Sequence, residues 1–280
     1  MPASRSNQSD SKLDAATAAA AVIEAREAPR VGAEFAIELH GPAFSAPLPA
    51  RARDISTSGI CFATASPIAL DSLGSVSLEL PTGPTRFNVE GRWQTNRGLD
   101  NSVLTGAVFV GLLPAEVASL WDLVDRTGRE IGSFLYESLH TQGASLDDAM
   151  SLAQVTRVRV VPRGRFLYQR HEPQVPGDDS IFFVRQGGVE MTVPVKPGHE
   201  VRVGKIGPGS VLGGLDSVVG MLPLESAQAN EETTLLEISK SAFAYLRVAK
   251  PLVAHWLGQI VLGEQLRRID GIVTRLAEKS

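Results

Sequence analysis

The sequence has a single cysteine and no run of about 18 consecutive apolar residues. One thiol cannot form a disulfide within the chain or a zinc site made of several cysteines, so Cys61 is predicted to be a buried structural residue. A helix needs about 20 mainly apolar residues to span a bilayer, so no membrane insertion is expected. The N-terminus has polar residues where a signal peptide would place a basic segment, which predicts a cytoplasmic protein.

Positive charge is also in short supply. The chain has 27 Lys and Arg residues against 31 Asp and Glu residues, which gives a formal net charge of -4. Proteins that bind nucleic acid hold its phosphates with clustered Lys and Arg side chains. No nucleic-acid partner is therefore expected.

Catalytic patterns are missing as well. The chain contains no GxxxxGK(S/T) phosphate loop, no HExxH zinc motif and no GxSxG elbow, and its five histidines are scattered. The carboxylate pairs Asp147-Asp148 and Asp178-Asp179 lie in polar connecting segments, where solvated charge is the usual explanation. We predict that the protein is not an enzyme and has no catalytic residue, no metal and no cofactor.

The sequence does have enough length and apolar content for two folded domains. At 280 residues it reaches the size at which single hydrophobic cores usually stop growing, and 43% hydrophobic with 21% charged residues is typical of a globular protein. Residues 1–25 are polar or Ala-rich without an amphipathic stripe, which predicts a flexible tail.

The first domain, residues 26–127, is predicted to be a small antiparallel β-barrel followed by a helix. Short apolar segments alternate there with Gly, Pro and Ser turn signals. These segments are 35–39, 52–55, 59–62, 76–80, 87–90 and 106–109. Pro114 then opens a stretch in which apolar residues recur near the 3.6-residue helical period. A helical linker follows at 128–153, with a second helical stretch at about 130–139 and a polar connection at 140–148.

The second domain, residues 154–280, is predicted to be a β jelly roll with helical residues at its C-terminus, so the fold class is mainly β. Its strand candidates lie between Gly- and Pro-rich turns. They are 155–161, 165–168, 181–185, 188–193, 201–206 and 234–238. After Pro251 the pattern is helical, and one face would carry Leu262, Leu266, Ile269, Val273 and Leu276. Only about two heptads are present, so a homodimer through the last helix is one possibility that the sequence leaves undecided.

Two motifs in the first domain suit a ligand that carries phosphates and guanines. Arg26 and Arg30 have RxxxR spacing before the first strand, and Asp54, Ser56 and Gly59 form a DxSxxG pattern at a strand end. A guanidinium can fork onto guanine O6 and N7, pair with phosphate or stack on a purine. Asp54 can accept from the guanine N1 and N2 donors, with the Ser56 hydroxyl nearby, and Gly59 is expected to allow a positive φ.

In this order, on a small barrel with a following helix, the motifs resemble the PilZ family of cyclic di-GMP receptors. The resemblance spans about residues 26–126 and includes the segment 106–109 as the last barrel strand. It implies a cyclic di-GMP site formed by Arg26, Arg30, Asp54, Ser56 and Gly59. Taken singly, the arginines also fit solvated charges, and the Asp and Ser fit caps of a turn.

Residues 155–243 resemble a cyclic-nucleotide-binding domain of the kind found in bacterial cAMP receptors and kinase regulatory subunits. The resemblance is carried by segments 162–168, 181–190 and 206–214. That family holds the ribose with a Gly-Glu pair and the cyclic phosphate with an Arg-Ser-Ala triplet. The matching residues here are Gly213, Gly214, Glu225, Ser226 and Ala227. The ribose acceptor is lost and a negative charge replaces the phosphate-binding cation, so cAMP affinity is predicted to be severely reduced.

Together these features predict a cytoplasmic cyclic di-GMP receptor that is not an enzyme. Ligand would order the Arg26 to Arg30 arm on the barrel and change how the two domains pack, and an unidentified protein partner would receive the output. Two alternatives are left open: a ligand-independent interaction scaffold, and a dual sensor of cyclic di-GMP and cAMP. A DNA-binding helix-turn-helix is not expected, because one continuous helical pattern follows Pro251.

Overall fold

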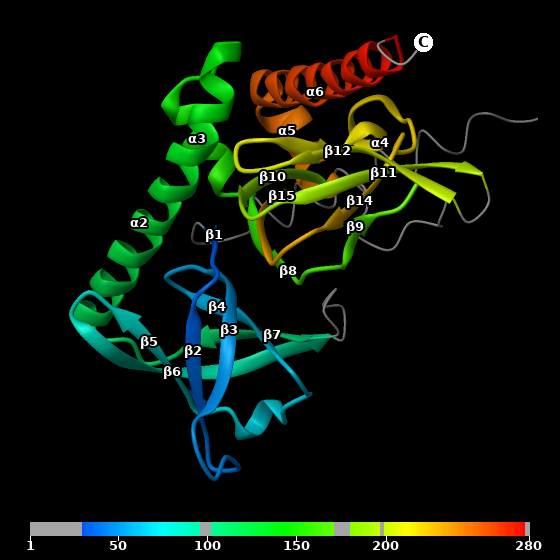
Figure 1. Cartoon of the computed structure of the whole chain (residues 1–280). Coiled ribbons are helices and arrows are strands. Elements are labelled where there is room, and N and C mark those ends of the chain that lie inside the picture. Colours follow the sequence, from blue (N-terminus) through cyan, green and yellow to red (C-terminus); the bar gives the residue numbers. More distant parts are fainter. Residues whose placement is uncertain (1–29, 96–101, 171–179, 197–198, 278–280) are drawn as a thin grey trace, which may run out of the picture. The chain divides into compact units, whose positions relative to one another are not determined.

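The computed structural model describes residues 30–95, 102–170, 180–196 and 199–277 (Figure 1). Contacts divide the chain into two compact units. The barrel unit comprises the described residues of 27–135 together with 149–160, and the second unit comprises those of 136–148 together with 161–280. The predicted domain limits stay predictions.

The described residues up to Phe109 form seven strands in the barrel unit. They are β1 (Val31–Gly32), β2 (Ala36–His40), β3 (Leu48–Ile55), β4 (Gly59–Thr64), β5 (Ser75–Leu80), β6 (Gly83–Thr95) and β7 (Val103–Phe109). Their hydrogen-bonded order is β1-β3-β2-β5-β6-β7-β4, and a further β3–β4 pairing closes six of them into an antiparallel barrel. A 3-10 helix, η1 (Leu70–Ser72), precedes β5. The predicted barrel is confirmed.

The barrel core is filled from strands and helix together. Phe62 and Phe87 are fully buried inside it, and Leu120, Leu123 and Val124 of helix α2 belong to the same cluster. Helix α2 (Pro114–Leu139) begins where Pro114 predicted, and the Leu113 N–H donates to the Glu116 carboxylate at 2.7 Å in the manner of a helix cap. The prediction of two separate helical stretches is wrong, because α2 runs unbroken to Leu139.

The connection after α2 is more ordered than its polar composition predicts. It forms a 3-10 helix, η2 (His140–Gln142), and a helix, α3 (Leu146–Ala153). Ser145 and Asp148 make a capping box, in which the Asp148 N–H donates to Ser145 Oγ at 3.2 Å and the Ser145 N–H donates to Asp148 Oδ2 at 3.0 Å. The prediction of a polar connection at 140–148 overlooks this S-x-x-D pattern, which is typical of a helix start.

The second unit is a jelly roll, as predicted, and its described strands together with β8 form two four-stranded sheets. One sheet has the order β13-β10-β15-β8 and the other β12-β11-β14-β9. Their strands are β8 (Arg157–Val161), β9 (Phe166–Tyr168), β10 (Ile181–Gln186), β11 (Val189–Lys196), β12 (His199–Ile206), β13 (Val211–Gly213), β14 (Ser226–Ala229) and β15 (Thr233–Ile238). Of β8, the last residue, Val161, belongs to this unit. It joins the core with Phe182, Leu212 and Leu235.

The described residues after β13 in the second unit also form the helices α4 (Leu215–Val219), α5 (Lys240–Ala249) and α6 (Pro251–Ala277). Helix α6 begins at Pro251, as predicted. Its buried face includes Leu257 and Val261, whereas Leu266 is 67% exposed and Ile269 is 44% exposed. The side chains of Val273 and Leu276 lie outside those described. Dimerisation through the exposed face stays a prediction.

Candidate functional site

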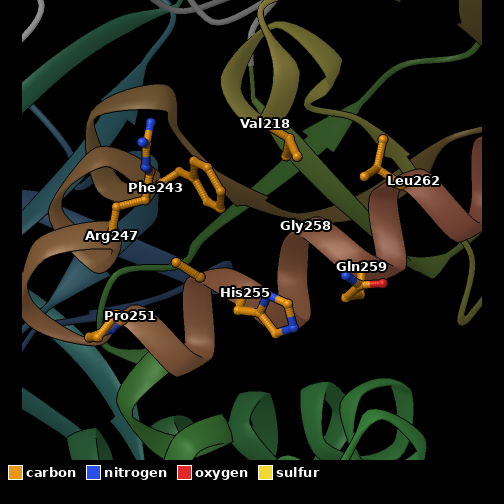
Figure 2. A pocket seen from close by; sticks show the side chains of 9 residues that line it. Val218, Phe243, Arg247, Pro251, His255, Gly258, Gln259 and Leu262 are labelled. Atoms are coloured by element: carbon orange, nitrogen blue, oxygen red, sulfur yellow. The ribbon is translucent and has the colours of Figure 1, made fainter.

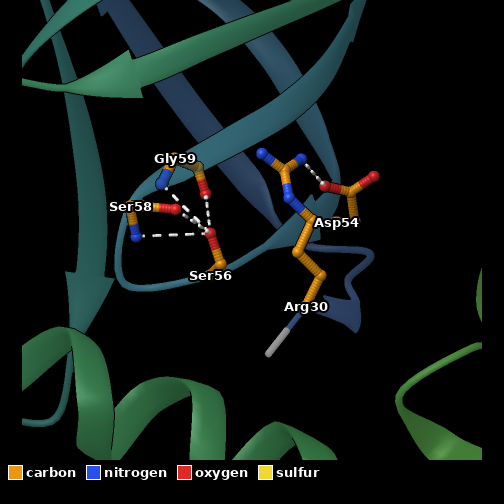
Figure 3. Close-up of polar contacts among 5 residues, drawn as sticks. All are labelled: Arg30, Asp54, Ser56, Ser58 and Gly59. Atoms are coloured by element: carbon orange, nitrogen blue, oxygen red, sulfur yellow. Dashed lines mark hydrogen bonds and ion pairs between the residues drawn. The ribbon is translucent and has the colours of Figure 1, made fainter. Parts of the chain in front are cut away.

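The structure brings Arg30 and Asp54 into direct contact (Figure 3). Arg30 Nη1 donates to Asp54 Oδ1 at 2.7 Å, and the two side chains are 26% and 24% exposed. Strand β1 positions Arg30, because Val31 pairs with Ile55 and Gly32 pairs with Asp54 at the end of β3. The other predicted arginine, Arg26, lies outside the described residues.

A β-bulge lies directly beside this ion pair. In the pairing of β3 with β4, Ala52 faces Phe62 and Asp54 faces Cys61, so Arg53 is the extra residue. Bulges re-aim side chains next to functional sites. Arg53 forms an ion pair with Glu34, which also contacts the exposed Arg51. Glu34 could not be identified from the sequence, because nothing in the residues around it indicates this pairing.

Ser56 lies in the turn that joins β3 to β4, and it is completely buried. Its hydroxyl accepts from the Gly59 N–H at 3.1 Å and from the Ser58 N–H at 3.3 Å, and it lies 3.2 Å from the Gly59 carbonyl oxygen (Figure 3). The hydroxyl therefore holds the turn in shape. Within the predicted site, Ser56 is a positioning residue for the neighbouring backbone.

Gly59 is required for a different reason from the one its sequence context suggests. Its φ is not positive, so the expectation of a left-handed residue at this point is wrong. Gly59 instead pairs with Val108 of β7, and a methyl group in its place would lie only 2.5 Å from the Ala107 carbonyl oxygen. Close approach of two backbones makes glycine necessary here.

Cys61, which pairs with Asp54 across β3 and β4, is buried, as its apolar surroundings predict. Burial raises the pKa of the Cys61 thiol to about 12, with a further rise from the Asp54 charge, while the charges of Arg157, Arg30 and Arg53 lower it. A thiol with such a pKa stays protonated and unreactive near neutral pH. Cys61 is thus a core residue whose pKa is affected by the charges of Asp54 and the nearby arginines.

The degenerate cassette of the second unit forms a closed polar cluster. Glu225 is buried, and its Oε1 accepts from Arg268 Nη1 at 3.1 Å, from Gln265 Nε2 at 3.2 Å and from the Tyr168 hydroxyl at 3.2 Å. Arg268 comes from α6 and also donates to the Val211 carbonyl oxygen. The carboxylate therefore has a counterion supplied by the chain itself.

Burial and the Glu225 carboxylate raise the pKa of Tyr168 well above its usual value, so the phenol remains a hydrogen-bond donor. Gly213 and Gly214 both have positive φ, 72° and 76°, in the turn from β13 to α4. Ser226 Oγ accepts from the Arg170 N–H at 3.1 Å, and Ala227 pairs with Met191 and Tyr168. Each predicted cassette residue thus has a structural partner or a backbone role.

A separate pocket of about 340 Å³ lies among α4, α5 and α6 (Figure 2). Phe243, Arg247, His255 and Gln259 are among the residues that line it, whereas none of the cassette residues do. The pocket is therefore distinct from the cassette.

No helix in the described part of the chain has the length and apolar character needed to cross a membrane. Among the same residues, no three His, Cys, Asp or Glu side chains are grouped so that they could hold a metal ion.

Comparison with known families identifies one part of the chain. Residues 158–248 match the family model of the cyclic nucleotide-binding domain, which confirms the predicted resemblance of the second domain. Such a domain implies a cyclic nucleotide sensor or regulator. The resemblance of the barrel to the PilZ family stays a prediction. No curated protein matches the sequence significantly.

Solved structures with similarity to the chain include a cyclic nucleotide-binding domain from Methylobacillus flagellatus, with 18% identity over 55% of this chain and 86% of that one, and a TM-score of 0.48. The Catabolite Activator Protein of Thermus thermophilus has 24% identity over 48% and 61%, with a TM-score of 0.41. The regulatory subunit of a cAMP-independent protein kinase A from Trypanosoma brucei has 13% identity over 64% and 60%, with a TM-score of 0.40.

Proposed function

We propose that this chain is a cytoplasmic, non-enzymatic receptor for cyclic di-GMP, which binds beside the Arg30–Asp54 pair of the barrel. The observation that carries this proposal is the convergence of two residues 24 positions apart, one cationic and one anionic, at the end of β3. Guanine presents both acceptors and donors on its edges, and each phosphate presents acceptors. Arg30 and Asp54 together supply both kinds of complementary group.

Both members of the pair are accessible enough to change partners. Each side chain is about a quarter exposed, and ion pairs of this kind contribute at most about 1 kcal/mol to stability. Exchanging the contact for a hydrogen bond to phosphate or guanine therefore costs little. The buried Ser56 turn keeps the backbone around Asp54 fixed while this exchange takes place.

Isothermal titration with cyclic di-GMP tests the proposal. The wild-type chain should bind, and Arg30→Ala and Asp54→Ala should each weaken binding by about tenfold or more, because each removes a charge-assisted contact. The matched control is Arg92→Ala, since Arg92 is exposed on the same barrel and pairs with Glu90 at 3.0 Å. Absence of heat with the wild type, or equal affinity in all variants, would refute the proposal.

We further propose that the cassette of the second domain does not take cAMP, so that this domain transmits the signal to a protein partner. Glu225 brings a negative charge to the position that a phosphate would need, and Arg268, Gln265 and Tyr168 already satisfy it. A cyclic phosphate would be repelled by Glu225 and would have to displace these donors.

A thermal-shift screen separates this proposal from its alternatives, since a ligand that binds only the folded state raises the melting temperature. We expect cyclic di-GMP to raise it and cAMP to leave it unchanged. A rise with both nucleotides would indicate the dual sensor. No rise with either would indicate the ligand-independent scaffold, which the closed Glu225 cluster also suits.

A further inference from the structure

Strand β1, which positions Arg30, packs directly on the backbone that leads into β8. A methyl group at Gly32 would lie 2.8 Å from the Val158 amide nitrogen and 2.9 Å from the Thr156 carbonyl oxygen. Only glycine allows the two backbones to approach so closely. Arg157 lies in the chain between Thr156 and Val158, the two residues that Gly32 contacts, so its backbone lies next to β1.

The charge of Arg157 acts at the barrel site. The three arginines whose charges lower the pKa of the Cys61 thiol are Arg157, Arg30 and Arg53, and Cys61 is the strand partner of Asp54. All three positive charges therefore act on the residue that faces Asp54. Residues 149–160 belong to the same compact unit as the barrel.

Arg157 differs from the other two cations because it forms no ion pair with a carboxylate of the described residues. Arg30 is paired with Asp54, and Arg53 with Glu34. Among the described residues no carboxylate forms an ion pair with Arg157, and its side chain is exposed. A dianionic ligand that reaches these arginines would meet one uncommitted guanidinium.

We propose that Arg157 is a further ligand-binding residue of the barrel site and pairs with one phosphate of cyclic di-GMP. This inference rests on the proposed function, since it assigns a residue to the same site. A guanidinium suits the role because its planar fork can donate to two phosphate oxygens at once.

Arg157 lies at the point in the chain where the second domain begins. It is the first residue of β8, and the match to the cyclic nucleotide-binding domain begins at the next residue, Val158. A phosphate held by Arg157 would therefore restrain the start of β8, the first strand of the second domain. Ligand binding at the barrel would in this way affect the second domain through the residues of β8 that follow Arg157.

Titration of cyclic di-GMP into Arg157→Ala, Arg157→Lys and the Arg92→Ala control tests the assignment. We expect about a tenfold loss of affinity for Arg157→Ala, a smaller loss for Arg157→Lys, which keeps the charge without the fork, and no change for Arg92→Ala. The melting temperature of unliganded Arg157→Ala should equal that of the wild type, because the side chain is exposed. A binding loss without a stability loss separates ligand contact from a structural role.

The outcomes distinguish this inference from the proposed function. Wild-type affinity in Arg157→Ala, together with a loss in Arg30→Ala, would overturn the role of Arg157 and leave the receptor proposal intact. No binding by the wild-type chain would overturn both. Hydrogen exchange tests the coupling: ligand should protect the amides of residues 157–161 in the wild type, and unchanged exchange would overturn the passage of the signal through β8.

Discussion

Both units contain an arginine–carboxylate pair at the predicted ligand position, but the two pairs differ in depth. Arg30 and Asp54 are about a quarter exposed and share a single hydrogen bond. Arg268 and Glu225 are 12% and 6% exposed, and Gln265 and Tyr168 also donate to the carboxylate. The shallow pair can exchange partners with a ligand, whereas the deep pair fixes the protein itself. Mutation of the shallow pair should therefore mainly weaken ligand binding, whereas mutation of the deep pair should mainly lower the free energy of unfolding.

The largest effect on stability should come from Arg268→Ala. The substitution leaves the buried Glu225 carboxylate without its counterion, which should lower the free energy of unfolding by about 3 kcal/mol. Arg267→Ala is the matched control, since Arg267 is 72% exposed and pairs with Glu264 one turn away. Urea denaturation measures both variants. Equal stabilities for the two variants would show that the deep pair is no more important than a surface pair.

The next largest loss of stability should come from Gly59→Ala, at the turn that shapes the barrel site. Gly59→Ala would place a methyl group 2.5 Å from the Ala107 carbonyl oxygen, and we expect a loss of about 2 kcal/mol in the free energy of unfolding. Gly74→Ala is the control, because a methyl group there would lie 3.5 Å from the His40 carbonyl oxygen, an ordinary contact. If both variants unfold at the same urea concentration, close backbone packing does not hold the barrel site.

Alkaline pH should affect the two regions over different ranges. Burial raises the pKa of Cys61 from 9.0 to about 12, so the unfolded chain loses this proton at a lower pH than the folded chain. The stabilisation is complete below the unfolded pKa and falls by about 1.4 kcal/mol per pH unit as the pH rises above it. Tyr168, whose pKa is raised well above 10.0, should add its own loss only at higher pH.

Urea denaturation at several pH values between about 8 and 10 measures this slope for the wild type and for Cys61→Ala. The variant should lose most of the slope, since it has no thiol to ionise in the unfolded state. An identical slope in both proteins would assign the alkaline sensitivity to other groups.

The smallest effect on stability should come from Arg30→Ala. A partly exposed ion pair is screened by solvent, so we expect the free energy of unfolding to fall by less than about 1 kcal/mol, although cyclic di-GMP affinity falls by about tenfold. Urea denaturation and titration on the same protein sample test both halves. A stability loss as large as that of Arg268→Ala would abolish the distinction between the two pairs.

Much of the barrel and part of its site could be predicted, because short-range patterns carry them. Alternating apolar residues and turn signals located all six closed strands, and the DxSxxG pattern located the turn between β3 and β4. The reason for Gly59 could not be predicted, since the Ala107 carbonyl that excludes a side chain is brought there by strand pairing.

Neighbouring residues alone indicate the strands, the turns and the loss of the phosphate-binding cation from the cassette, because each of these is a local property of the chain. The counterion of Glu225 could not be predicted from local patterns, because Arg268 lies 43 residues away and reaches this carboxylate through the packing of α6. The same holds for Arg157, which lies far along the chain from Asp54 and comes next to β1 only because Gly32 allows two backbones to touch. Contacts between residues so far apart in the sequence depend on sheet and helix packing, which local residue patterns do not specify.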